Sequence, residues 1–164
     1  MSPANNNTAA LIYQPGRDLQ SLRRAYAAYE VELQLIEKQN TIHEPPYWWE
    51  SGKNISFFYV KKRNSVHGFV IVAYGEHVDA DVASEICEIW IDPICRDARV
   101  FSRLMEAAID ALQYPAGFQV FRGNVRGTRL FENLLNRRNV SWNKWEGRDG
   151  SLAVVKYRIP GKND

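Results

Sequence analysis

The middle of the chain alternates twice between a strand pattern and a helix pattern, and this alternation constrains the fold most. Ser84 to Ile91 is a short run rich in isoleucine that Asp92-Pro93 ends. Apolar residues then recur at helical spacing, namely Phe101, Leu104, Met105, Ala108 and Leu112. A further strand is expected over Phe118 to Phe121 and a further helix over Thr128 to Arg138. Such a unit is typical of an α/β domain built on a central sheet.

The flanking segments add one helix and two hairpins. A helix is expected from Asp18, a good capping residue, to about Asn40. One hairpin pairs Ile55–Lys61 with Gly68–Tyr74, and the other pairs Val140–Trp145 with Ser151–Ile159. With 164 residues, of which 45% are hydrophobic, we expect a single α/β domain over residues 11–164, after a polar arm over residues 1–10. Its mixed central sheet should be flanked by helices.

Charge, targeting and cysteine content exclude several classes of protein. The net charge is only +2, so no nucleic acid partner is expected, although five arginines lie between Arg122 and Arg138. The first residues lack a basic start and an apolar core, and no apolar stretch approaches the roughly 20 residues that span a bilayer. Cys87, Cys95 and three scattered histidines form no ligand pattern, which predicts no metal site. We expect a cytoplasmic protein with no membrane partner.

Two local motifs resemble the GNAT superfamily of acetyl-CoA-dependent N-acetyltransferases. The strand ending at Asp92-Pro93, followed by Arg96 and a helix, resembles the strand, Arg/Gln-x-x-Gly-x-Gly/Ala loop and helix of that family. Asn124 to Glu132 resembles its Asn-x-x-Ala-x-x-Phe/Leu-Tyr-Glu motif. The resemblance implies a GNAT-like fold. It also implies that acetyl-CoA, if it is bound, contacts Ile91, Arg96, Arg99, Val100 and Asn124.

The sequence departs from this family where the cofactor and the proton donor are expected. The family loop offers backbone N–H groups to the pyrophosphate of coenzyme A, and glycines let the backbone approach. Here Arg99 and Phe101 replace those glycines, and Asp97 adds a negative charge. The family's tyrosine, a general acid for the departing thiolate, corresponds to Phe131. These departures predict weak or no acetyl-CoA binding.

Two acidic residues on the strand before the loop are candidate catalytic bases. The family often places a general base there, and both Glu85 and Glu88 qualify. Strand alternation places Glu88 on the same face as Ile86 and Trp90, where it is either a base or a partly buried polar group.

These observations leave two functions open. The first is a catalytically degenerate GNAT-fold protein that serves as a binding or assembly component. It resembles acetyltransferase-like proteins of tailed bacteriophages, so a virion or the host cytoplasm is its expected location. The second is an active N-acetyltransferase that uses acetyl-CoA, in which Glu85 or Glu88 deprotonates an amine.

A loop rich in aromatic residues is a candidate contact surface for a protein partner or a second copy of the chain. Tyr47, Trp48 and Trp49 follow two prolines, and clustered aromatic residues often mark interfaces. The alternative is that both tryptophans fold back onto the core, since tryptophan is usually well buried.

Overall fold

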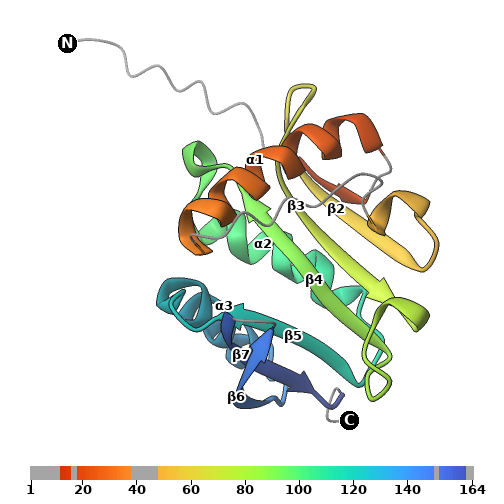
Figure 1. Ribbon diagram of the computed structural model, residues 1–164, viewed down its shortest axis with the longest axis vertical. Helices are drawn as coiled ribbons and strands as arrows, with labels where there is room; N and C mark the ends of the chain where they lie inside the picture. The colour runs from red at the N-terminus through yellow and green to blue at the C-terminus, as the bar shows by residue number, and fades with distance from the viewer. Residues whose placement is uncertain (1–11, 16–17, 38–47, 150–151, 162–164) are drawn as a thin grey trace.

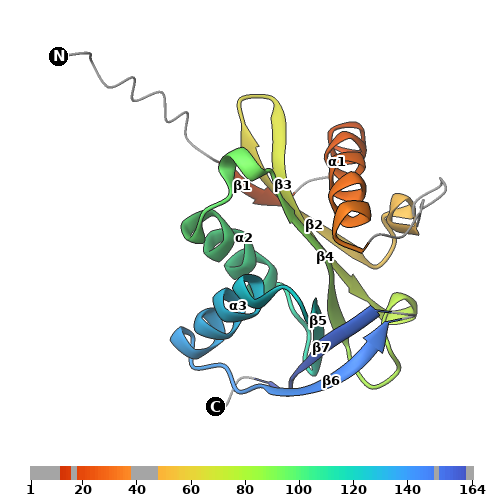
Figure 2. The ribbon, with the colours of Figure 1, turned by 60° about the vertical axis from the view of Figure 1, so that its left-hand side comes forward.

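One seven-stranded sheet forms the centre of the protein. The computed structural model describes residues 12–15, 18–37, 48–149 and 152–161, and the strand order is β1-β2-β3-β4-β5-β7-β6. Helix α1 lies on one face of the sheet, and α2 and α3 lie side by side on the other (Figure 1, Figure 2). In chain order the elements are β1 (Ile12–Pro15), α1 (Leu19–Glu37), β2 (Ile55–Lys62), β3 (Ser65–Tyr74), β4 (Ser84–Ile91), α2 (Ala98–Asp110), β5 (Ala116–Phe121), α3 (Val125–Arg137), β6 (Asn143–Asp149) and β7 (Leu152–Ile159).

This architecture confirms the α/β fold class and places most elements where the sequence predicts them. Helix α3 begins three residues earlier than expected, because the side chain of Asn124 caps it by accepting from the Gly127 N–H. Strand β6 begins later than expected and extends to Asp149, into the predicted turn. Strand β1, which pairs antiparallel with β2 at the sheet edge, was not predicted. The polar arm over residues 1–10 lies outside the described residues.

Strands β4 and β5 are the only parallel neighbours among the described strands, and they separate along their length. Their pairing covers Ser84 to Ile86 on β4 and Ala116 to Phe118 on β5, after which the strands diverge (Figure 1). Beyond Ile86, β4 therefore keeps only its antiparallel neighbour β3. Helices α2 and α3 follow β4 and β5, so both helices start at the same edge of the sheet. In open α/β sheets ligands bind at such points.

A β-bulge in β4 corrects the predicted orientation of Glu88. Ile71 pairs with Glu88 and Val72 pairs with Ile86, so Cys87 is an extra residue without a partner in the register. The bulge reverses the alternation after Ile86. Ile86 packs in the core below α2 and α3, whereas Trp90 packs in the core below α1. Glu88 shares a face with Trp90, as expected, but not with Ile86.

The two tryptophans of the predicted contact loop differ in their environment. Trp49 is fully buried, with its ring 5.2 Å from that of Tyr26 and 6.1 Å from that of Phe57. Trp48 is 36% exposed and lies beside the ring of His77. Trp49 is therefore a core residue, which corrects its assignment to a partner surface. Trp48 stays a candidate for that surface, and Tyr47 lies outside the described residues.

This difference predicts unequal effects on stability. Trp49→Ala should lower the free energy of unfolding by about 3–5 kcal/mol, because it leaves a cavity below α1. Trp48→Ala, the matched control, should cost less than about 1 kcal/mol. Urea unfolding followed by circular dichroism measures both values. Equal losses would show that the two side chains are not divided between core and surface in this way.

Candidate functional site

The start of helix α2, where the family loop would hold a phosphate, is capped by its own side chain. The Asp97 carboxylate accepts hydrogen bonds from the backbone N–H groups of Arg99 (2.8 Å) and Val100 (2.9 Å). The Phe101 N–H donates to the Asp97 carbonyl at 3.1 Å. Two of the N–H groups that could bind an anion at this helix end, those of Arg99 and Val100, are thus already satisfied by an anionic side chain.

Arg96 is fixed by contacts within the protein. Its guanidinium forms two hydrogen bonds to Glu32 on α1, at 2.7 and 2.8 Å, and two to the carbonyl of Ile91, at 3.0 and 2.6 Å. Trp90 Nε1 donates to the same Glu32 carboxylate at 2.8 Å. The hydrogen bonds from Arg96 hold the pKa of Glu32 below its ordinary value. Arg96 therefore ties α1 to the end of β4.

Two more of the predicted cofactor residues, Val100 and Asn124, have structural roles at the same edge of the sheet. Val100 is buried in the core, and Asn124 caps α3. A Cβ at Gly127 would lie 2.6 Å from the Asn124 amide, so this glycine gives the capping side chain its space. The side chain of Arg99 is exposed at the start of α2.

The position that the family's tyrosine would occupy is buried in this protein. Phe131 is fully buried, with its ring 4.2 Å from Phe118 and 5.2 Å from Tyr157. Tyr157 donates its own hydroxyl to Glu132 at 2.8 Å. Phe131 has no proton to donate, and its burial gives it a packing role.

Glu88 lies under helix α1 and is held by two tyrosines. Tyr29 donates to one of its carboxylate oxygens at 2.5 Å, and Tyr26 donates to the other at 3.3 Å. Burial raises the pKa of Glu88 to about 7, although the tyrosine hydrogen bonds lower it in part. Glu88 can therefore exchange a proton near neutral pH, in a position covered by α1.

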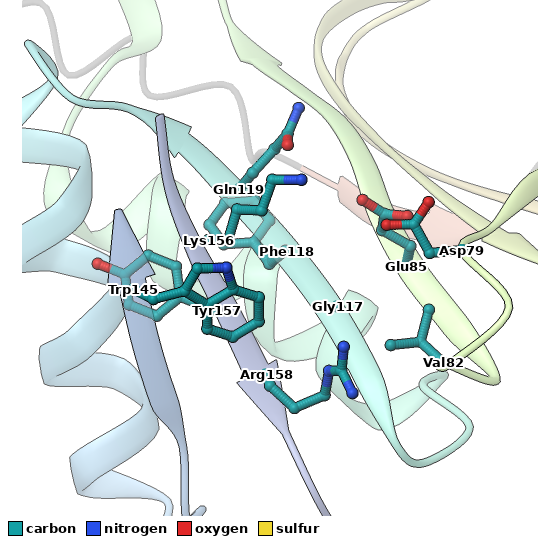
Figure 3. Close-up of a pocket in the computed structure, with 10 residues that line it drawn as sticks. All are labelled: Asp79, Val82, Glu85, Gly117, Phe118, Gln119, Trp145, Lys156, Tyr157 and Arg158. Atoms are coloured by element: carbon teal, nitrogen blue, oxygen red, sulfur yellow. The ribbon is translucent and has the colours of Figure 1, made fainter. Parts of the chain in front are cut away.

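Glu85 lines a pocket on the same face of the sheet, beyond the area that α1 covers. Gly117 on β5 lies at the centre of this pocket, with Glu85, Asp79 and Val82 on one side (Figure 3). Lys156, Arg158 and Trp145, from β7 and β6, lie on the other side, and Gln119 closes one end. Burial raises the pKa of Glu85, and the nearby charge of Asp79 raises it further. Glu85 thus faces an open pocket, whereas Glu88 lies under α1 and is bonded to two of its tyrosines.

Sequence reasoning missed two features of this site. The capping role of Asp97 had a signal, since aspartate directly before an apolar-periodic helix is a preferred cap. The pocket had none, because Asp79, Gly117 and Lys156 lie far apart in the sequence and meet only through the sheet order. Within the described residues, no cluster of three or more His, Cys, Asp and Glu side chains is arranged to hold a metal ion. No helix in the described ranges is long and apolar enough to cross a membrane.

Solved structures that share this fold include acetyltransferases of low sequence identity to this chain. No protein-family model matches the sequence, and no curated protein does. Diaminobutyrate acetyltransferase EctA from Paenibacillus lautus superposes with a TM-score of 0.67 at 10% identity, over 95% of this chain and 98% of EctA. Arabidopsis thaliana NAA60 in complex with acetyl-CoA superposes with a TM-score of 0.63 at 10% identity, over 92% of this chain and 98% of NAA60. Escherichia coli ElaA superposes with a TM-score of 0.63 at 10% identity, over 91% of this chain and 99% of ElaA. The chain has the GNAT acetyltransferase fold.

The raised pKa of Glu88 predicts a pH-dependent stability. In the folded state its pKa of about 7 exceeds the ordinary 4.5, so the folded state binds a proton more tightly than the unfolded state. The free energy of unfolding should therefore fall as the pH rises from 5 to 8, by about 2 kcal/mol from this group. Glu88→Gln cannot titrate and should lack this component. Urea unfolding of both proteins at pH 5 and pH 8 measures the difference, and identical pH dependences would contradict the assignment.

Proposed function

We propose that this protein is a non-catalytic binding protein built on the acetyltransferase fold. The observation that carries the proposal is the Asp97 cap on helix α2. In the GNAT family the corresponding N–H groups hold the pyrophosphate of coenzyme A, whereas here the amides of Arg99 and Val100 already bind a carboxylate. A pyrophosphate at this place would have to displace Asp97 and would meet its negative charge.

Two further features support this proposal. The guanidinium of Arg96 donates hydrogen bonds to Glu32 and to the Ile91 carbonyl, so it is poorly available to a ligand. Phe131 fills the position of the proton donor with a buried ring. The pocket beside Glu85, on the face opposite α2 and α3, is open to solvent. A protein that binds a ligand in this pocket without catalysis does not need acetyl-CoA. The phage-type assembly role expected from the sequence stays a prediction.

The second candidate, an active N-acetyltransferase, is favoured by Glu85 and by the divergence of β4 from β5. Glu85 would take a proton from an amine, and the nitrogen would attack the thioester carbon of acetyl-CoA. A C–N bond forms as the C–S bond breaks, and the thiolate leaves to be protonated by water. A free N–H of β4 beyond Ile86 would polarise the carbonyl oxygen. This candidate predicts release of free thiol from acetyl-CoA in the presence of an amine, and loss of that release in Glu85→Gln.

Calorimetric titration with acetyl-CoA separates the two functions. For the unmodified protein we expect no saturable binding below about 1 mM, because the phosphate position is taken. Asp97→Asn keeps a capping oxygen but removes the charge, whereas Asp97→Gly removes both. The affinity for acetyl-CoA should increase from the unmodified protein to Asp97→Asn and again to Asp97→Gly. Asp97→Gly should destabilise α2 by no more than about 1 kcal/mol. A micromolar dissociation constant for the unmodified protein would overturn the proposal and favour the enzyme.

A further inference from the structure

Strand β6 lies at one edge of the sheet and, among the described strands, has a neighbour on one side only. It pairs with β7 along its whole length, Asn143–Asp149, and Figure 2 shows it as the outermost strand of the sheet. Every residue of β6 except Gly147 is exposed. An edge strand of this kind can hydrogen-bond to a further strand.

The register shows which residues of β6 direct their backbone groups away from β7. The Arg122 N–H donates to the Ala153 carbonyl at 2.9 Å, so the odd-numbered residues of β7 face β5 and the even-numbered ones face β6. The β6 partners of those even-numbered residues all carry odd numbers. The N–H and C=O groups of the even-numbered residues of β6 therefore point out from the sheet edge. These residues are Lys144, Glu146 and Arg148.

The opposite edge of the sheet is less suited to pairing. Strand β1 has only four residues, Ile12–Pro15, and its last residue has no N–H to donate. Short edge strands and prolines both discourage the addition of a further strand. Strand β6 is longer and contains no proline.

The charges of β6 complement those of a second copy in one antiparallel register. With Trp145 opposite Trp145 of the second copy, Lys144 lies opposite Glu146, and the same pair forms again by symmetry. A register centred on Glu146 would instead oppose like charges, at Glu146 itself and between Lys144 and Arg148. A register centred on Gly147 would pair Glu146 with Arg148, but it would place Lys144 beyond the end of the second copy's β6. The register centred on Trp145 satisfies the most charges.

The contacts that these side chains already make extend this complementarity. Lys144 contacts Glu132 on α3 at 2.8 Å, and Glu146 contacts Arg122 at 3.3 Å. The new pairs would join these two ion pairs into one row of alternating charge. On the other face of the strand, Trp145 is 43% exposed. Its backbone faces β7, so across the new edge it takes a non-hydrogen-bonded position, where opposed side chains approach most closely.

We propose that two copies of this chain associate through β6, in an antiparallel pair centred on Trp145 that joins the two sheets into one. The association goes beyond the proposed function, because β6 lies apart from Asp97 and acetyl-CoA binding does not enter the argument. It commits to one partner, a second copy of this chain, and to one register.

Sedimentation equilibrium of the full chain and its charge variants tests the pairing. For the unmodified protein we expect a mass of twice the 18.9 kDa of the chain at about 500 µM. Lys144→Glu and Glu146→Lys each oppose like charges and should raise the dimer dissociation constant at least about tenfold. An equimolar mixture of these two variants should associate again, because each chain then meets the opposite charge on the other.

Arg148→Glu is the matched control on the same strand. In the proposed register this exposed residue lies opposite the uncharged Trp142, so its reversal should change the dissociation constant by less than about twofold. Circular dichroism confirms that each variant is folded. Amide hydrogen exchange should slow at Lys144 and Glu146 as the protein concentration rises, but not at Trp145. A monomer at about 500 µM, a mixture that stays monomeric, or an equal loss in Arg148→Glu would overturn the proposal.

Discussion

The backbone N–H groups at the start of helix α2 can bind one anion at a time, and in this protein that anion is the carboxylate of Asp97. Its carboxylate binds the amides of Arg99 and Val100, which fixes where α2 begins. The start of α2 sets in turn which of its residues face the sheet, and Leu104 and Met105 are fully buried there. The capping that orders the helix is therefore the same interaction on which the proposed loss of the phosphate position rests.

Strand β4 connects this helix end to the two acidic candidates. At its end, Arg96 joins the Ile91 carbonyl to Glu32, so α1 and the loop before α2 are held together. In its middle, the bulge at Cys87 turns Glu88 under α1, where tyrosines cover it. At its start, Glu85 reaches the open part of the sheet and lines the pocket. One strand thus ends in contacts within the protein, at Arg96, and begins beside an open pocket, at Glu85.

The sequence predicted the sheet and helices well because they depend on local periodicity and on stops such as Asp92-Pro93. It predicted the wrong face for Ile86 relative to Glu88, because alternation assumes an unbroken register and the bulge at Cys87 is set by pairing with β3. Composition could not separate Trp48 from Trp49, since adjacent residues differ only in the direction they face. The pocket depends on β5 and β7 lying side by side, and this contact is not local.

The central claim, that Asp97 occupies the anion position of α2, can be tested at the two amides themselves. The backbone N–H signals of Arg99 and Val100 in a ¹H–¹⁵N NMR spectrum report directly on the acceptor they contact. Inorganic pyrophosphate or acetyl-CoA, added at pH 7, should leave both signals in place in the unmodified protein and should shift both in Asp97→Gly. Saturable shifts of both amides in the unmodified protein would show that phosphate displaces the carboxylate, and would contradict the account.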